Sequence, residues 1–312
     1  MSRVFEALNK ASNDKKQRDE RTSENLEHAA PQPVLLGKGA ELIHLQGERN
    51  GKRLEPTMSL PVSKNGNRSW REKLEEIVFG WDLRRYTTYP IVAIDKDSPA
   101  AEQYKILREQ IKRLRTEAGI QTFAISSPVK RDGKTTVAVN LAAALALDYE
   151  EKVLLIDGDL RDPGVHRYFN LQGSPGLADF LGSNHHTAIK DLVQDTFLPS
   201  LRVLPAGRPS GFSSELLAKE KMSQAMEEIR TEFPGHQIVI DCPPVLSTPD
   251  PMVIARQVDG VLMVVRAGKT PRDYLMKALQ SINSSKVVGI VLNGADLGIA
   301  SKYYYYSTNG SH

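Results

Sequence analysis

Short, almost uninterrupted apolar runs alternate with helical patterns over residues 122–294, and this alternation constrains the fold more than any other feature. Most of these runs are rich in Val, Ile and Leu, and all are shorter than a typical helix. Apolar strands that are separated by helices are typical of a parallel sheet with helices on both faces. We therefore predict an α/β fold with a doubly wound, mainly parallel sheet. The expected strands cover residues 122–127, 152–159, 201–207, 236–244, 260–268 and 287–294.

The chain divides into three parts by composition. Residues 1–88 are mostly polar and carry several prolines, so they hold too few apolar side chains to offset the entropy that ordering costs. We predict a flexible polar leader there, with short helical segments. Residues 89–300 carry the alternating pattern and form the expected globular domain. Residues 301–312 form an expected flexible tail that is rich in tyrosine.

Composition restricts the partners and the compartment. The net charge of the 312 residues is only +3, which gives no reason to expect a nucleic-acid partner. The single cysteine, Cys242, allows no internal disulfide and fits a reducing cytoplasm; we interpret it as a small buried residue rather than a nucleophile. His185 and His186 lie in a polar stretch that is more typical of a solvated loop than of a metal site. Neither a signal peptide nor a membrane-spanning segment is expected.

A candidate phosphate-binding loop follows the first of these strands and opens an alanine-rich helix. At such a strand-to-helix junction, backbone N–H groups and the helix amino terminus can cradle phosphate oxygens. Lys134 would reach the β- and γ-phosphates, and the Thr135 hydroxyl would bind Mg²⁺. The alternative is an ordinary capped helix start. The residues of the candidate loop are Lys130, Arg131, Asp132, Gly133, Lys134, Thr135 and Thr136.

Carboxylates follow two of the other strands. Asp157 and Asp159 are two residues apart and therefore lie on the same side of an extended chain. Such a pair beside a phosphate loop suits Mg²⁺ binding and the acceptance of a hydroxyl proton, whereas an acidic helix cap would explain only one of them. Asp241 follows another buried strand and would hold the metal through water. Asn293 ends the last strand and either reads the adenine edge or forms a turn.

With these residues placed, residues 89–300 resemble the bacterial tyrosine kinases, or BY-kinases, cytoplasmic modules associated with capsule and exopolysaccharide synthesis. That family lies within the MinD/ParA-like P-loop ATPases with deviant Walker motifs. A further likeness is a helix with Glu102, Lys105 and Arg108 on one face, which resembles the oligomerisation helix of the family, although Lys105 stands where arginine is usual. The motifs that carry the resemblance are GKTT at 133–136, VLLIDGDLRDP at 153–163, GLADFL at 176–181, VIDCPPV at 239–245, VVGIVLN at 287–293 and the tyrosine cluster.

The resemblance implies a function and its partners. ATP and Mg²⁺ would bind at the phosphate loop, with Thr135, Asp157 and Asp241 around the metal, and Lys134, Asp157, Asp159 and Asp241 would carry out transfer to a tyrosine. Subunits would form a ring in which one subunit phosphorylates the tail of its neighbour, regulating polysaccharide synthesis, chain length or export. A separate transmembrane co-polymerase would activate the kinase at the inner face of the plasma membrane, and external tyrosine substrates are possible. The expected phosphate acceptors are Tyr303, Tyr304, Tyr305 and Tyr306.

The loop also departs from the family pattern. Relatives carry small residues before Gly-Lys-Ser/Thr, whereas Arg131 stands here at a point where the backbone should approach phosphate closely. Two rival interpretations therefore remain. One is a MinD/ParA-type positioning ATPase, although the signature lysine of those proteins is replaced here by Val129 and Lys130 is displaced by one residue. The other is a degenerate ATP-binding regulator of the same export complex. We favour retained ATP binding because Lys134, Thr135 and the carboxylates are all present.

Overall fold

The computed structural model describes residues 89–95, 98–148, 151–182, 187–209, 216–217 and 219–295, together with the backbone of residues 42–45. The predicted acceptors Tyr303–Tyr306, most of the predicted leader, and both His185 and His186 lie outside the described residues. No helix among the described residues is long and apolar enough to cross a membrane.

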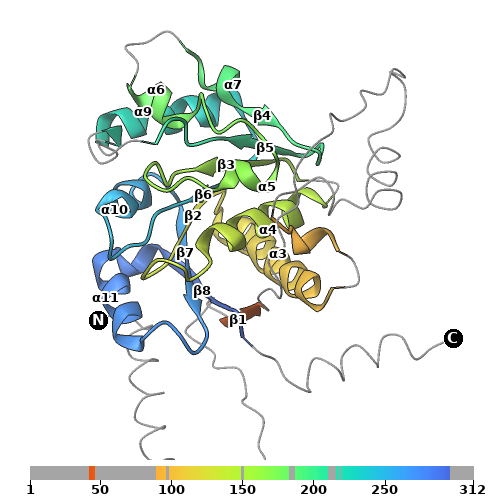
Figure 1. The fold of residues 1–312 in the computed structure, drawn as a ribbon, viewed down its shortest axis with the longest axis vertical. Coiled ribbons are helices and arrows are strands. Elements are labelled where there is room, and N and C mark those ends of the chain that lie inside the picture. Colours follow the sequence, from red (N-terminus) through yellow and green to blue (C-terminus); the bar gives the residue numbers. More distant parts are fainter. Residues whose placement is uncertain are drawn as a thin grey trace, which may run out of the picture.

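A sheet with the strand order β1-β8-β7-β2-β6-β3-β5-β4 forms the centre of the described part of the chain (Figure 1). Neighbouring strands pair in parallel except for β4 and β5, which pair antiparallel. The fold class predicted from the sequence is therefore confirmed. The strands are β1 (Leu42–Leu45), β2 (Thr122–Ser126), β3 (Val153–Asp157), β4 (Gln194–Asp195), β5 (Leu201–Leu204), β6 (Gln237–Asp241), β7 (Gly260–Arg266) and β8 (Val287–Asn293).

All six predicted strands are present, each a little shorter than its apolar run. Two further strands were not predicted. β4 has only two residues, and β1 lies within the predicted leader and extends the sheet beside β8, with Leu42 opposite Ile290. A strand of four residues within polar sequence is too short to show a recognisable periodicity. Its pairing partner is also almost 250 residues away in the chain, so no local pattern indicates the pairing.

Helices cover both faces of the sheet, and the sheet lies between two hydrophobic cores (Figure 1). Buried side chains of α3, α4, α5 and the short 3₁₀ helix η2 pack on one face, and those of α6, α7, α9, α10 and α11 pack on the other. The first set is η2 (Val92–Ile94), α3 (Pro99–Ala118), α4 (Lys134–Ala146) and α5 (Val165–Tyr168). The second set is α6 (Leu177–Gly182), α7 (Ile189–Leu192), α9 (Lys219–Glu232), α10 (Asp250–Ala255) and α11 (Arg272–Ser281), and η3 (Ser284–Lys286) precedes β8.

The alanine-rich helix α4 is buried on all sides from Val137 to Ala146. Its small side chains let it lie close to the sheet beneath α3. Asn140, in the middle of this helix, is fully buried, but both ends of its amide are bonded: Oδ1 accepts from the Ala93 backbone N–H at 3.0 Å and Nδ2 donates to the Thr136 carbonyl at 2.9 Å. The middle of the helix that follows the phosphate loop is thus joined to η2 through Asn140.

Strand order brings the predicted carboxylates to one edge. β6 lies between β2 and β3, so Asp241 is in register with Ile125 on one side and with Asp157 on the other. The carboxyl ends of these three parallel strands therefore meet at the start of α4. This edge is where open α/β sheets bind their ligands.

Candidate active site

The phosphate loop connects β2 to α4 and ends in a residue that must be glycine. Gly133 has φ 96° and is the N-cap of α4, where no side chain caps the helix. A Cβ at this position would overlap the side-chain amide of Asn293. The first N–H groups of α4 therefore remain without a side-chain acceptor, as an anion site at a helix amino terminus requires.

Arg131 adopts the left-handed backbone conformation, with φ 70°. A non-glycine residue in this region costs about 1–2 kcal/mol, so the loop is strained at this residue. The side chain is exposed, and the Arg131 carbonyl accepts a hydrogen bond from Arg266 Nη1 at 3.2 Å. Lys130 is also exposed. Both cations thus lie on the outer surface of the loop.

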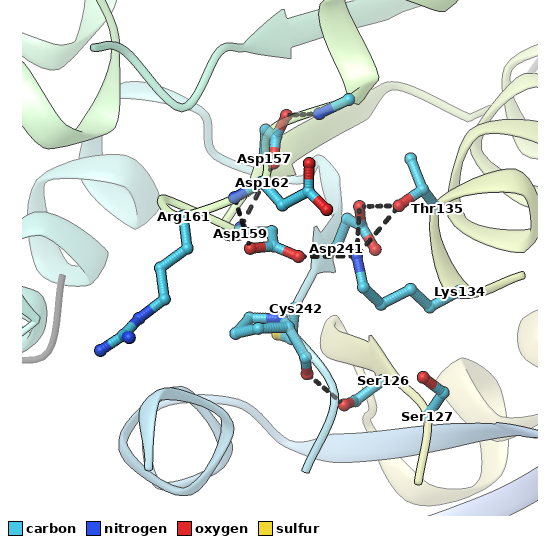
Figure 2. Close-up of polar contacts among 12 residues, drawn as sticks. Ser126, Ser127, Lys134, Thr135, Asp157, Asp159, Arg161, Asp162, Asp241 and Cys242 are labelled. Carbon is cyan, nitrogen blue, oxygen red and sulfur yellow. Dashed lines mark hydrogen bonds and ion pairs between the residues drawn. The ribbon is translucent and has the colours of Figure 1, made fainter. Parts of the chain in front are cut away.

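Lys134 is the centre of a network of buried charges (Figure 2). Its Nζ lies 2.8 Å from Asp159 Oδ2 and 3.7 Å from Asp241 Oδ2, and it donates to Thr135 Oγ1 at 3.1 Å. Burial by itself would lower the pKa of Lys134, but the negative charges of Asp241 and Asp159 outweigh burial and raise the pKa above its ordinary value. The ammonium group is therefore charged at any physiological pH.

Asp241 has one bonded and one unbonded oxygen. Its Oδ2 accepts a hydrogen bond of 2.6 Å from the Thr135 hydroxyl, whereas its Oδ1 is buried without a hydrogen-bond partner. Burial raises the pKa of this carboxyl group, although Lys134 and Thr135 act in the opposite direction. A buried carboxylate oxygen without a partner is costly and calls for an explanation, of which a bound cation is one.

Asp157 organises the loop that follows β3. Its Oδ2 accepts hydrogen bonds from the backbone N–H groups of Gly164 and Val165, both at 3.0 Å, and its Oδ1 accepts from that of Asp159 at 3.2 Å. Burial and the nearby charge of Asp241 raise the pKa of Asp157. Asp159 is also buried, and its second oxygen accepts from the Asp162 backbone N–H at 3.1 Å. These contacts aim the Asp159 carboxylate at Lys134.

The protein oxygens at this site suit Mg²⁺ only when a phosphate supplies further ligands. Among the described residues, no three His, Cys, Asp or Glu side chains are grouped so that they could hold a metal ion by themselves. The Thr135 hydroxyl and the unbonded Asp241 oxygen are nevertheless the hard oxygen ligands that Mg²⁺ prefers. Since Mg²⁺ usually keeps several waters and is shared with substrate phosphates, two protein oxygens fit this ion.

Residues at the rim support the loop rather than the carboxylates. The Thr136 hydroxyl shares a hydrogen bond of 2.9 Å with the Tyr168 hydroxyl. Asn293 Nδ2 donates to the Asp132 carbonyl at 2.9 Å, so its amide contacts the loop itself, and its predicted reading of adenine stays a prediction. The Cys242 thiol is buried and donates to the Ile240 carbonyl at 3.6 Å, in agreement with a packing role.

Two contributors to the loop were missed from the sequence. Thr270 and Arg266 come from the end of β7 and the turn that follows it, and both contact the loop at residues 131–132. Thr270 lies 138 residues from its partner Asp132, and no local motif marks it. Such a contact can be recognised only when the strand order is known.

The predicted oligomerisation residues lie on α3, away from the loop. The side chains of Glu102 and Lys105 are 54% and 41% exposed and form an ion pair with each other. Arg108 pairs with Glu109 at 2.8 Å and is 22% exposed. The structure thus presents these charges on the surface of the helix, and their contact with another subunit stays a prediction.

The fold and this site define a P-loop nucleotide-binding protein of the α/β class. A protein-family model described as "AAA domain" matches residues 131–285. The tyrosine-protein kinase YwqD of Bacillus subtilis (strain 168) is 31% identical over 220 residues, which cover 70% of this chain and 91% of that protein. The putative tyrosine-protein kinase CapB of Staphylococcus aureus is 32% identical over 226 residues, covering 72% of this chain and 97% of that protein.

A solved structure agrees with these relatives. The kinase domain of the Escherichia coli tyrosine kinase ETK matches with a TM-score of 0.61 and 27% identity, covering 71% of this chain and 87% of that domain. The chain therefore belongs to the family of bacterial tyrosine-protein kinases. The enzyme class predicted from the sequence, a protein-tyrosine kinase, is confirmed.

Proposed function

We propose that this kinase binds ATP with Mg²⁺ at the phosphate loop and transfers the γ-phosphoryl group to the tyrosines Tyr303–Tyr306 of a neighbouring copy. The observation that carries the proposal is the convergence of Lys134, Thr135 and Asp241 at the carboxyl ends of three adjacent parallel strands. A cation, a hydroxyl and a carboxylate at the start of a helix are what a nucleotide phosphate and its metal need.

Each buried group has a role in this reaction. Lys134 neutralises charge on the phosphates and the free amino end of α4 receives their oxygens. Thr135 and Asp241 would hold Mg²⁺, which supplies further charge neutralisation when it is bound. The phenol oxygen of the acceptor forms the new bond to phosphorus, the bond from phosphorus to the leaving ADP oxygen breaks, and Asp159 accepts the phenol proton. Asp157 acts indirectly, since its oxygens hold the backbone that carries Asp159.

Neighbouring copies would meet through α3. Glu102, Lys105 and Arg108 are all partly or largely exposed, so partners in another subunit can replace the contacts they now make within α3. In this proposal the tyrosines Tyr303–Tyr306, which follow β8 by about ten residues, enter the site of the neighbouring subunit. Each phosphate added to the tail brings roughly −1.5 to −2 charges at neutral pH, and the resulting repulsion would loosen a ring.

The resemblance to BY-kinases supplies the cellular setting of the proposal. We infer a role in regulating exopolysaccharide or capsule synthesis, chain length or export, together with a separate transmembrane co-polymerase that activates the kinase. The enzyme would then lie in the cytoplasm, at the inner face of the plasma membrane, through this partner. External protein tyrosines are further candidate substrates.

A mixed-subunit experiment tests the proposal. Subunits with Lys134→Met and an intact tail are incubated with active subunits whose four tail tyrosines are replaced by Phe, with and without the cytoplasmic fragment of the activator. Phosphotyrosine at residues 303–306 of the Lys134→Met subunit, mapped by mass spectrometry, is the expected result. If Lys134→Met does not fold, Thr135→Val serves as the inactive acceptor.

Other outcomes would refute parts of the proposal. ATP hydrolysis without any tail phosphotyrosine would favour a positioning ATPase. Loss of both hydrolysis and labelling in the unmodified protein would favour an ATP-binding regulator with a degenerate loop. Labelling that occurs only within one subunit would overturn transfer between neighbours. Labelling by a subunit that carries Lys134→Met would overturn the assignment of the site.

A further inference from the structure

The outer part of the phosphate loop is held by side chains from β7, which lies next to β2, from the turn after β7, and from β8. Thr270 Oγ1 donates to Asp132 Oδ1 at 2.6 Å, and Asn293 Nδ2 donates to the Asp132 carbonyl at 2.9 Å. Arg266 Nη1 donates to the Arg131 carbonyl at 3.2 Å. Three side chains, from β7, β8 and the turn after β7, thus form hydrogen bonds with two consecutive residues of the loop.

The side chain of Asp132 is buried within this contact. It is only 3% exposed, and its second oxygen accepts from the Val129 backbone N–H at 3.3 Å. One carboxylate therefore ties the start of the loop to its end and ties both to Thr270. A carboxylate buried at this depth is favourable only while its hydrogen bonds are satisfied.

Thr270 itself is fixed on its own side of the contact. Its hydroxyl oxygen accepts from the Arg266 backbone N–H at 2.8 Å while its proton goes to Asp132. The same turn is joined to β8, because the Ala267 N–H donates to the Asn293 carbonyl at 2.9 Å. The Thr270 hydroxyl is therefore oriented by its contacts with the sheet, independently of the loop.

The hydrogen bond between Thr270 and Asp132 lies next to the residues that would bind phosphate. Asp132 immediately precedes Gly133 and Lys134, which begin α4 and face the expected phosphates. Arg131, just before it, is held in a left-handed conformation that its own side chain disfavours. Without an external hold, the backbone at residues 131–133 could relax to other conformations, and its N–H groups would lose their common direction.

We propose that Thr270 is a positioning residue that, through Asp132, holds the phosphate loop of this kinase in the conformation that binds ATP. The inference rests on the proposed ATP site. It assigns to the turn after β7 a part in nucleotide affinity, and it explains how a loop with Arg131 in place of a small residue keeps a binding conformation.

The test compares Thr270→Val with Thr270→Ser. Valine keeps the shape but has no hydroxyl, whereas serine retains it. We expect Thr270→Val to raise the KM for ATP in tail autophosphorylation about tenfold, the effect of losing one hydrogen bond to a charged acceptor, with kcat changed less than about twofold. Thr270→Ser should restore a KM near that of the unmodified enzyme. The matched control is Thr231→Val in α9, whose hydroxyl donates to the Glu227 carbonyl at 2.9 Å away from the loop.

The results distinguish failure of the inference from failure of the proposed function. An unmodified enzyme that shows no saturation with ATP would refute the ATP site, and the role of Thr270 with it. If that enzyme saturates and Thr270→Val has the same KM, or changes kcat alone, only the role of Thr270 is refuted. If Thr270→Val does not fold, Thr270→Ala takes its place, since alanine also lacks the hydroxyl; an unchanged KM in that variant refutes the role equally.

Discussion

Replacement of Lys134 by Met removes a buried cation and keeps an unbranched side chain of similar length. The side chain is only 13% exposed, and Nζ lies 2.8 Å from Asp159 and 3.7 Å from Asp241. At an effective dielectric constant of about 20, unit charges at these separations attract by roughly 6 and 4 kcal/mol, much of which the desolvation of the charges cancels. Since removal of one partner leaves buried carboxylates uncompensated, we expect the free energy of unfolding to fall by about 3–5 kcal/mol near neutral pH.

The loss should depend on pH in a defined direction. Burial already raises the pKa of Asp157 and of Asp241, and removing the nearby cation raises both further. The native variant then binds more protons than the unfolded chain does, so its stability falls as the pH rises and recovers as the pH is lowered. The deficit of Lys134→Met relative to the unmodified protein should therefore be smaller at pH 5 than at pH 8.

Urea unfolding at pH 5, 6.5 and 8 measures this effect. The matched control is Lys112→Met, which breaks a pair of 2.6 Å with Asp148 whose side chains are 32% and 18% exposed. Solvent screening should keep its cost to about 1 kcal/mol or less. A deficit of Lys134→Met that is equal at pH 5 and pH 8, or no larger than that of Lys112→Met, would refute the reasoning.

Two further predictions concern the same edge of the sheet. Gly133→Ala should lower the free energy of unfolding, measured in urea, by more than about 2 kcal/mol, because φ is 96° and the new Cβ overlaps Asn293. The control Gly119→Ala, with φ 67° and open space around the new Cβ, should lower it by only about 1–2 kcal/mol. Equal losses in the two variants would contradict the overlap. Burial raises the pKa of Asp157 above its ordinary value of 3.8, so the native protein keeps a proton there that the unfolded chain releases, and stability should fall as the pH rises from about 4 towards neutrality. Asp157→Asn should flatten this slope in thermal unfolding, and an unchanged slope would exclude Asp157 as its source.

Much of the site could be predicted because its chemistry is local in the chain. Lys134 and Thr135 follow a strand and open a helix, and Asp157 and Asp241 each end an apolar strand. In a parallel sheet all such ends lie at one edge, so their proximity follows from the alternation of strands and helices. The departure at Arg131 from the small residues of the family was visible in the sequence, and the structure adds that its backbone is left-handed.

Contacts between distant segments could not be predicted in the same way. The sequence predicted a catalytic role for Asp159 but not its ion pair with Lys134, and it gave no sign that Asp132 would be buried against Thr270. Both contacts depend on which strand lies next to which and on how deeply each side chain is covered. β1, which pairs with β8, went unrecognised for the same reason.

The sequence by itself determined the fold class, the strand-to-helix loop and the acidic residues around it, because periodicity and short motifs act over a few residues. Only the tertiary structure decided the strand order, with β6 between β2 and β3, and thereby brought Thr135 within 2.6 Å of Asp241, 106 residues further along the chain. It also decided which carboxylates are buried, which have raised pKa values and which side chains hold the loop. These properties depend on distances and burial in three dimensions, which the spacing of residues along the chain does not predict.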